Sequence, residues 1–307
     1  MRLFMGEQLK GFICVFSAAL LWGISGPIAK YMFNMNVDPF ELVQIRLILS
    51  FLLIFSFLAV FSKKLLRLER EDYLYVFILG IIGVAVVQFT YLYTISATNV
   101  ATAVFLEYLA PIFVLTYGVL RGQEVLSRIN GTAIILAAAG GYLIVKGNLQ
   151  GGLAVSTEGL ISGLTAASSF AFYTVYTKRG LAKYSPLTIM CWSYAVGAVC
   201  WIIYQNPLVS FSHYHGQVWL IIIYYVVLAT VVPYGLFFKG LSYLTPLKTG
   251  LTANLEPVIA AASAYLMLGE KLTVMQLLGC ASILLAVTVI QLRFKNSLKQ
   301  QFNGPND

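Results

Sequence analysis

Apolar segments of about 20 residues recur along the whole chain with short polar gaps between them, and this pattern limits the possible folds most strongly. A helix rises 1.5 Å per residue, so about 20 apolar residues are needed to cross roughly 30 Å of hydrocarbon. Of the 307 residues, 59% are hydrophobic and only 10% are charged, and the mean hydropathy is +0.83. A soluble domain has roughly a quarter charged residues. The sequence therefore predicts an all-α integral membrane protein.

Ten transmembrane helices are predicted from the positions of these segments. Their expected bounds are 11–33, 40–61, 73–95, 100–120, 128–146, 159–181, 186–205, 217–238, 249–268 and 273–292. If the N-terminus lies in the cytoplasm, sixteen of the 20 lysine and arginine residues fall in cytoplasmic segments. The positive-inside rule then predicts a multi-pass protein of the cell membrane with both termini in the cytoplasm.

The second half of the chain repeats the first. Residues 103–126 align without a gap with residues 249–272 at an offset of 146, and Pro111 falls on Pro257. Each half has five predicted spans, an odd number, so the second copy enters the membrane with the opposite orientation. The sequence therefore predicts two inverted five-helix repeats, at 11–146 and 159–292.

Each aligned copy carries one carboxylate deep in its apolar run, Glu107 in the first and Glu256 in the second. Burying an acid there costs on the order of 2.5 to 3.5 kcal/mol, so each should face a partner, a cavity or a proton. A structural hydrogen bond between helices is the alternative. Arg46 is expected at a depth like that of Glu107, so the two either form an ion pair or each meet an opposite charge on a substrate. Arg46 can also snorkel outward along its stem.

Several aromatic residues and one amide accompany these charges in the sequence. Aromatic rings attract organic cations through their negative faces, although single rings more often serve only packing. Asn254 lies within one helical turn of Glu256 and otherwise suits an interhelical hydrogen bond. The candidate substrate pathway comprises Trp22, Arg46, Tyr91, Glu107, Tyr108, Tyr234, Asn254 and Glu256, with Phe170 as a further aromatic neighbour.

Two prolines interrupt predicted helices near their middles, Pro27 in the first span and Pro233 in the eighth. A proline removes one backbone hydrogen bond, so we expect a hinge, polar backbone exposed to a cavity, or an inert kink. A run of small residues at 137–141 would allow close helix approach, within a monomer or across a homodimer.

No constellation for enzymatic chemistry is found in the sequence. His213 and His215 form an incomplete metal site on a loop, and no Walker A, haem or nucleophile motif occurs. The basic residues lie in short loops, which indicates membrane topology rather than nucleic-acid binding. We therefore expect no catalytic residue, metal or cofactor, and we expect a small-molecule substrate and the lipid bilayer as partners.

Two stretches carry a resemblance to a known family. LLWGISGPIAKY in the first span and LFFKGLSYLTPLKTGLTANLEPVIAAASAYLMLGEKLT across spans eight and nine resemble the drug/metabolite transporter superfamily, specifically the EamA-type bacterial transporters. The resemblance implies ten helices around a central cavity and alternating access without ATP. It implies secondary active transport of a small polar metabolite such as an amino acid or amine. Either acid is also a candidate for a coupling proton, because an acid in an apolar site has a raised pKa. The alternatives are a passive channel or a non-transporting membrane protein.

Overall fold

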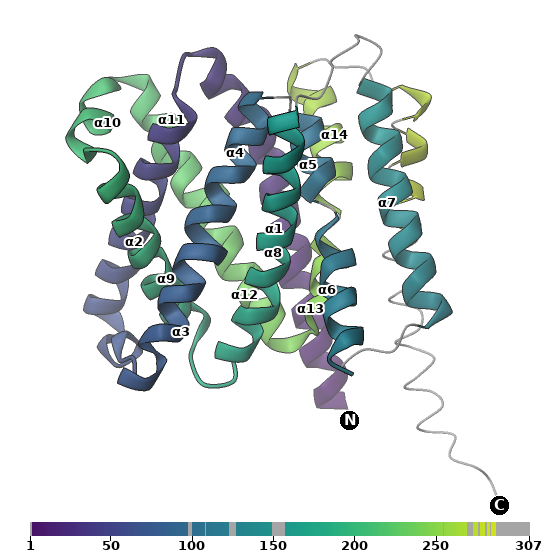
Figure 1. Ribbon diagram of the computed structural model, residues 1–307, viewed down its shortest axis with the longest axis horizontal. Coiled ribbons are helices and arrows are strands. Elements are labelled where there is room, and N and C mark those ends of the chain that lie inside the picture. The colour runs from purple at the N-terminus through teal and green to yellow at the C-terminus, as the bar shows by residue number, and fades with distance from the viewer. Residues whose placement is uncertain are drawn as a thin grey trace, which may run out of the picture.

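The protein is a bundle of helices that run side by side (Figure 1). The computed structural model describes residues 2–97, 100–107, 109–122, 127–148, 157–253, 255–268, 273–275, 277–279, 281–282 and 284–286, and it contains no strand within these ranges. Five stretches are helical, long and apolar enough to cross a membrane: Glu7–Phe33, Pro39–Phe61, Arg70–Ile95, Pro186–Tyr204 and Gln217–Tyr243. An all-helical fold with several membrane-spanning helices is thus confirmed.

The helices of the two halves follow each other in chain order. In the first half they are α1 (Arg2–Asn34), α2 (Pro39–Phe61), α3 (Tyr73–Ile78), α4 (Val87–Ala97), α5 (Val100–Glu107), α6 (Ala110–Leu120) and α7 (Arg128–Asn148). In the second half they are α8 (Thr157–Gly180), α9 (Pro186–Tyr204), α10 (Pro207–His213), α11 (Gln217–Val226), α12 (Val232–Tyr243), α13 (Pro246–Ala253) and α14 (Glu256–Leu268). Short 3₁₀ turns at Lys63–Leu66 and Arg70–Asp72 join α2 to α3. Nine of the twenty residues of the tenth predicted span, 276, 280, 283 and 287–292, lie outside the described residues.

Three helices start at a capping residue followed by proline. The Asp38 carboxylate accepts hydrogen bonds from the main-chain N–H groups of Phe40 and Glu41 at the start of α2. Ser185 and Asn206 cap α9 and α10 in the same way. Proline suits the first helical position because its fixed φ matches the helix and its missing N–H would be unpaired there.

The third and eighth predicted spans each contain a π-helical segment. Leu79–Val86 lies between α3 and α4, and Val227–Val231 lies between α11 and α12. Shifting the first segment by the offset of 146 places it over the second. A π turn widens the helix locally and often marks a functional site, and neither segment was predicted.

The fourth and ninth predicted spans are each divided into two shorter helices rather than continuous. One break separates α5 from α6, the other separates α13 from α14, and the same offset relates them. Pro111 and Pro257 stand just beyond the breaks. A proline cannot donate to the carbonyl four residues earlier and disfavours helical geometry in the residue before it, which accounts for the interruptions.

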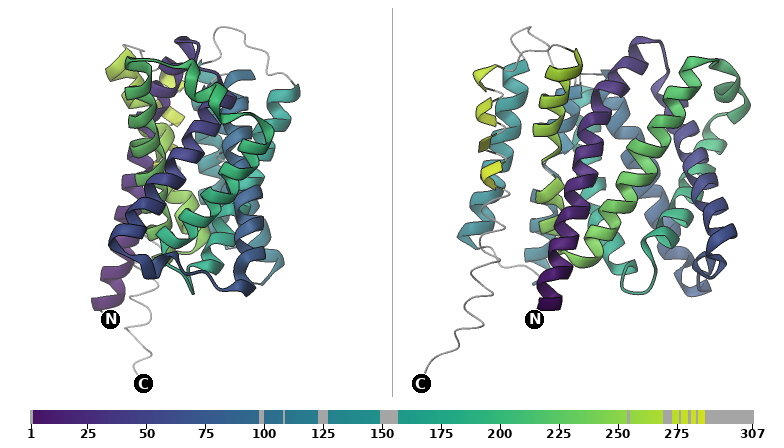
Figure 2. Two further views of the ribbon diagram at one scale, coloured as in Figure 1. Left: turned by 90° about the vertical axis from the view of Figure 1, so that its left-hand side faces the viewer. Right: turned by 180° about the vertical axis from the view of Figure 1, so that it is seen from behind.

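Close helix packing surrounds these irregular segments. Seen from behind, α1 lies beside α12 and α14 (Figure 2). The α8 helix packs in a corresponding way against α4, α5 and α6, and α2 packs against α9. Gly240 lets α12 approach α1 closely, because a Cβ there would come within 2.9 Å of the Gly11 main-chain oxygen. Large apolar side chains such as Leu120, Ile203 and Leu220 are exposed on the outer surface, as in a helix bundle that faces lipid.

A polar cluster joins the start of α2 to the segment after α10. The buried Glu41 carboxylate accepts a hydrogen bond of 2.6 Å from the Tyr214 hydroxyl, and the His213 Nδ1 lies 2.9 Å from its other oxygen. The Tyr214 hydroxyl also accepts a hydrogen bond of 2.9 Å from the Asp38 main-chain N–H. Burial and the bond to Glu41 raise the pKa of Tyr214, so the phenol remains a donor. His213, which the sequence placed in an incomplete metal site, thus contacts the Glu41 carboxylate.

Replacing Tyr214 by phenylalanine is expected to lower the free energy of unfolding by about 1 to 3 kcal/mol, because it leaves a buried carboxylate oxygen and an N–H without this partner. Thermal unfolding in detergent measures the change. Tyr204→Phe is the matched control, since the Tyr204 side chain is 68% exposed and its hydroxyl makes no hydrogen bond within the described residues. Equal stability of the two variants would contradict the assigned role of Tyr214.

A second polar cluster joins the α2–α3 connection to the α8–α9 connection. The Lys183 ammonium contacts the carboxylates of Asp72, at 2.6 Å, and Glu69. The Tyr184 hydroxyl donates to Asp72 as well. The hydrogen bonds from Lys183 to Asp72 and Glu69 raise the pKa of the lysine. Because the cluster is exposed, it contributes mainly to the pairing of the two connections rather than to overall stability.

Candidate functional site

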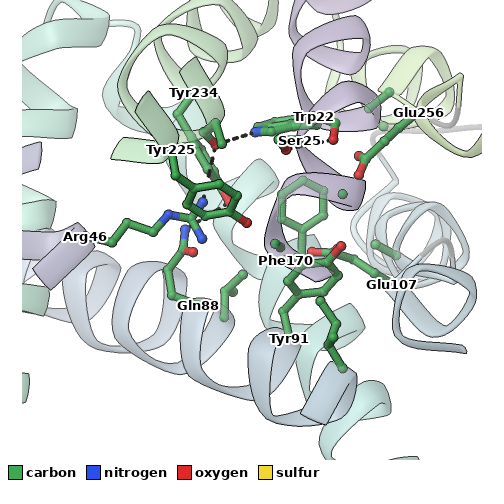
Figure 3. A pocket seen from close by; sticks show the side chains of 18 of the residues that line it. Trp22, Ser25, Arg46, Gln88, Tyr91, Glu107, Phe170, Tyr225, Tyr234 and Glu256 are labelled. Atoms are coloured by element: carbon green, nitrogen blue, oxygen red, sulfur yellow. Dashed lines mark hydrogen bonds between the residues drawn. The ribbon is translucent and has the colours of Figure 1, made fainter. Parts of the chain in front are cut away.

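A cavity of about 60 Å³ lies where the broken helices α5/α6 and α13/α14 meet the rest of the bundle (Figure 3). This is several times the space that one water molecule requires. The helices α1, α2, α4, α8, α11 and α12 complete its wall. The cavity therefore lies beside both helix breaks and beside the π-helical segment that precedes α12.

The structure brings six of the eight predicted pathway residues to the wall of this one cavity. They are Trp22, Arg46, Tyr91, Glu107, Tyr234 and Glu256, and the aromatic neighbour Phe170 joins them. The other two, Tyr108 and Asn254, lie outside the described residues. The part these side chains take in a substrate pathway remains a prediction.

The Arg46 guanidinium is buried and held by the π-helical segment rather than by an acid. Its Nε donates a 2.5 Å hydrogen bond to the Thr230 hydroxyl, and its Nη2 donates a 3.4 Å hydrogen bond to the Ala229 carbonyl. The guanidinium also lies over the Tyr225 ring, 5.1 Å from the ring centre. Within the described residues Arg46 and Glu107 form no ion pair, and Figure 3 shows them on opposite sides of the cavity. Snorkelling outward is excluded by the burial of Arg46.

Pro233 explains why the Ala229 carbonyl is available to Arg46. A proline has no N–H, so the carbonyl four residues earlier loses its helical donor. The Trp22 indole N–H donates to that same carbonyl at 3.2 Å. Pro27 acts in the same way on Gly23, whose carbonyl accepts a 2.9 Å hydrogen bond from the Ser263 hydroxyl. We expected these prolines to expose polar backbone to a cavity. For Pro233 this holds, because the Ala229 carbonyl belongs to a residue of the cavity wall.

Glu107 and Glu256 occupy opposite helix ends at the two breaks. Glu107 is the last residue of α5, and Glu256 is the first residue of α14. Both side chains line the cavity. No hydrogen bond or ion pair among the described residues involves either carboxylate. Among the residues that the structure describes, neither acid therefore makes the structural hydrogen bond between helices that was the alternative.

Sequence reasoning missed several residues of the wall. The Gln88 amide donates a 3.0 Å hydrogen bond to the Tyr234 hydroxyl, and these two residues are separated by the offset of 146. The internal repeat was thus the signal that would have found Gln88. Ser25 donates to the Trp22 carbonyl at 2.8 Å, and the Trp22 ring meets the Tyr234 ring edge to face at 4.9 Å. No sequence pattern singled out Ser25.

The wall combines charge, hydrogen-bonding groups and aromatic faces around a small cavity. Such a site can hold a small polar or charged molecule through a few directed contacts, with ring faces covering its apolar part. The described residues contain no group of three or more His, Cys, Asp or Glu side chains placed to hold a metal ion. Sites at the breaks of discontinuous membrane helices are typical of secondary transporters. The fold and the cavity thus define the class of membrane transporters.

Comparison with known proteins identifies the family within that class. The EamA-like transporter family matches residues 9–146 and again residues 157–292, which together make up most of the chain. The chain belongs to the EamA-like transporter family, within the drug/metabolite transporter superfamily. A crystal structure 18% identical in sequence matches with a TM-score of 0.76, covering 93% of this chain and 98% of the other, which shows the shared fold.

Several relatives carry transporter names. The inner membrane transporter YicL of Salmonella typhimurium, described as uncharacterized, is 30% identical over 94% of this chain and 97% of its own. An uncharacterized transporter of Archaeoglobus fulgidus is 30% identical over 90% of this chain and 93% of its own. The threonine/homoserine exporter RhtA of Escherichia coli K12 is 25% identical over 84% of this chain and 83% of its own. The protein is therefore a multi-pass membrane transporter.

Proposed function

We propose that this protein is a secondary active transporter of a small polar metabolite such as an amino acid or amine, and that it works by alternating access without ATP. The observation that carries the proposal is the small cavity at two equivalent helix breaks, lined by Arg46, Glu107 and Glu256. Charged side chains in an apolar membrane protein are costly, and they commonly mark the path of a substrate or an ion.

The proposed architecture is ten helices in two inverted repeats, 11–146 and 159–292, with both termini in the cytoplasm. Four features support it. The helix breaks, the π-helical segments and the Gln88–Tyr234 pair are all related by the offset of 146. The packing of α1 on α12 and α14 has a counterpart in that of α8 on α4, α5 and α6. Inverted repeats of this kind give a transporter two exchangeable states around one site.

The name of RhtA suggests the first cargo to test, because that relative is a threonine/homoserine exporter. Purified protein in liposomes preloaded with L-threonine, L-homoserine, isopropanolamine or β-hydroxybutyrate should exchange at least one of them for its labelled form outside. We expect uptake that saturates, that is accelerated by internal substrate and that needs no ATP. Protein-free liposomes measure the leak.

The competing functions give different results in the same assay. A passive channel would show flux that rises linearly with concentration and is not accelerated by internal substrate. A membrane protein that does not transport would give the leak of protein-free liposomes for every compound. Either outcome would contradict secondary transport of amino acids or amines.

A further inference from the structure

Four buried hydroxyls make no hydrogen bond of normal geometry among the described residues. They belong to Ser50 of α2, Tyr173 and Thr177 of α8, and Tyr194 of α9. Each of these residues is at most 1% exposed, and the hydroxyls of Tyr173 and Tyr194 are neighbours that still do not pair. Buried polar groups without a partner are costly and rare in native proteins, so these four require a physical reason.

The internal repeat relates two of these hydroxyls to the cavity wall. Residues 17–19 of α1 align with residues 165–167 of α8 at an offset of 148. The α1 residues in the wall are Trp22, Ser25, Gly26 and Ala29. Their counterparts on α8 are Phe170, Tyr173, Thr174 and Thr177. Of these four counterparts Phe170 alone lines the cavity, so the other three occupy positions that are open on α1 and closed on α8.

The closed positions of α8 lead away from the cavity in the opposite direction from their α1 counterparts. The α1 helix begins, and the α8 helix ends, at the end of the bundle where the N-terminus lies (Figure 1). Contacts with the end of α12 agree with this placement, since Gly11 packs against Leu244 and the Lys178 ammonium donates a 2.6 Å hydrogen bond to the Leu241 carbonyl. From the cavity, α1 therefore leads to one face of the bundle and α8 leads to the other. The proposed topology places the α8 side in the cytoplasm.

The π-helical segments extend this correspondence to a second pair of elements. Ala229 of the cavity wall lies in the segment before α12, and the offset of 146 places it on Gly83 in the segment before α4. In the wall, the Trp22 indole bonds the Ala229 carbonyl. On the other side, Gly83 packs on Tyr173, because an added Cβ would lie 2.4 Å from the tyrosine ring. The counterparts of wall residues thus contact each other as the wall residues do.

We propose that Tyr173 and Thr177 line a second half of the substrate path, which runs from the cavity to the face where α8 ends and is closed in this structure. The inference rests on the proposed transport function. Two inverted repeats exchange their conformations during alternating access, so α8 takes up the exposure that α1 has here. The two hydroxyls then meet water and the polar groups of the cargo, which accounts for their lack of partners in the closed state. With Thr174 between them, this half offers hydrogen bonds and no fixed charge.

Thiol labelling of the purified protein in detergent tests the proposal without a transport assay. A charged methanethiosulfonate reagent reacts with thiols that reach water, and mass analysis of peptides reads each site separately. Thr177→Cys places a thiol on the proposed path, at a position that is 0% exposed in this structure. We expect this thiol to react at least tenfold faster than buried thiols elsewhere, because opening of the second half admits the reagent.

Two buried thiols serve as the references. Leu58→Cys lies at a 0% exposed position three residues before the last residue of α2, as Thr177 does in α8. Native Cys191 of α9 is also 0% exposed. The offset of 147 that places Pro39 on Pro186 gives neither site a counterpart in the cavity wall. Reaction at position 177 no faster than at these two sites would overturn the proposal.

Gly83→Ala tests the exchange between the two halves of the path. The added methyl group overlaps the Tyr173 ring in the present state, whereas the counterpart Ala229 carries a methyl group in the open wall. The variant should therefore favour the state in which the α8 side is open. We expect labelling of Thr177→Cys to rise at least fivefold while labelling of Ser25→Cys, on the present wall, stays constant or falls. General loosening raises both rates, so a rise at both sites or at neither would refute the exchange.

Lys178→Met is the second variant, for use if Gly83→Ala lacks a cooperative unfolding transition. It keeps the apolar stem but removes the ammonium that bonds the Leu241 and Ser242 carbonyls and so holds α8 to the end of α12. The same rise at position 177 is expected, and an unchanged rate would contradict the proposal. Exchange in liposomes combined with slow labelling at position 177 leaves transport standing and eliminates this path. Fast labelling without exchange of any compound supports the opening and refutes transport of those compounds.

Discussion

Replacing Arg46 by alanine is expected to lower the free energy of unfolding by about 3 kcal/mol and to reduce substrate exchange at least tenfold. The change removes two hydrogen bonds, to Thr230 and Ala229, and the contact with the Tyr225 ring. It also removes the only positive charge among the described wall residues. Thermal unfolding in detergent and exchange in liposomes measure the two effects.

One further variant shows which property of Arg46 matters, and a second serves as a control. Arg46→Lys keeps the charge but cannot reproduce the planar donor geometry, so we expect a smaller loss of stability than with alanine and partial exchange. Arg128→Ala removes an exposed arginine at the start of α7 and should leave both measurements unchanged. An Arg46→Ala variant with wild-type stability and exchange would show that the π-helical segment does not depend on the guanidinium.

Replacing Gly23 by alanine is expected to destabilise the protein by about 1 to 3 kcal/mol and to weaken transport. An added Cβ would lie 2.8 Å from the Ile259 side chain and 2.9 Å from the Glu256 main-chain oxygen. The main-chain oxygen cannot move without shifting the start of α14. The bond from Ser263 to the Gly23 carbonyl would be strained as well. The change therefore acts directly on one of the two helix breaks.

Gly131→Ala is the matched control for Gly23→Ala, because among the described residues no atom beyond its chain neighbours and the backbone of α7 lies within 4 Å of an added Cβ there. Alanine is the better helix former, so this variant should be more stable than wild type by roughly 0.5 to 1 kcal/mol. The two midpoints of thermal unfolding should therefore move in opposite directions. If both substitutions stabilise the protein, the contact between α1 and α14 is looser than the structure indicates.

The sequence pattern was sufficient to predict the helical membrane fold, and it singled out seven of the nineteen described residues that line the cavity. Apolar length identified the spans. The residues Asp38, Ser185 and Asn206 before prolines, which known capping preferences favour at helix starts, were a further usable signal. The buried charges Arg46 and Glu107 were singled out by their cost in an apolar span. The prediction of an all-helical membrane fold succeeds because it depends on local sequence and on the properties of lipid.

Other features depend on contacts that no local pattern reveals. The 100–120 and 249–268 segments were predicted as continuous helices because their composition is apolar throughout, yet Pro111 and Pro257 follow real breaks. The aligned prolines were a usable signal. The π-helical segments have no such signature. The partners of Glu41 and Arg46 lie more than 170 residues away in the chain, so only the folded packing of α2 against the second half determines them.

The two π-helical segments also bear on the ancestry of the chain. A π turn accommodates one more residue than the α-helical turn that it replaces, so a single inserted residue creates one without disturbing the helix on either side. The same family matches both halves of this chain, and both halves carry the wide turn at positions related by one offset. The wide turn is therefore a feature that the two family-matched halves share.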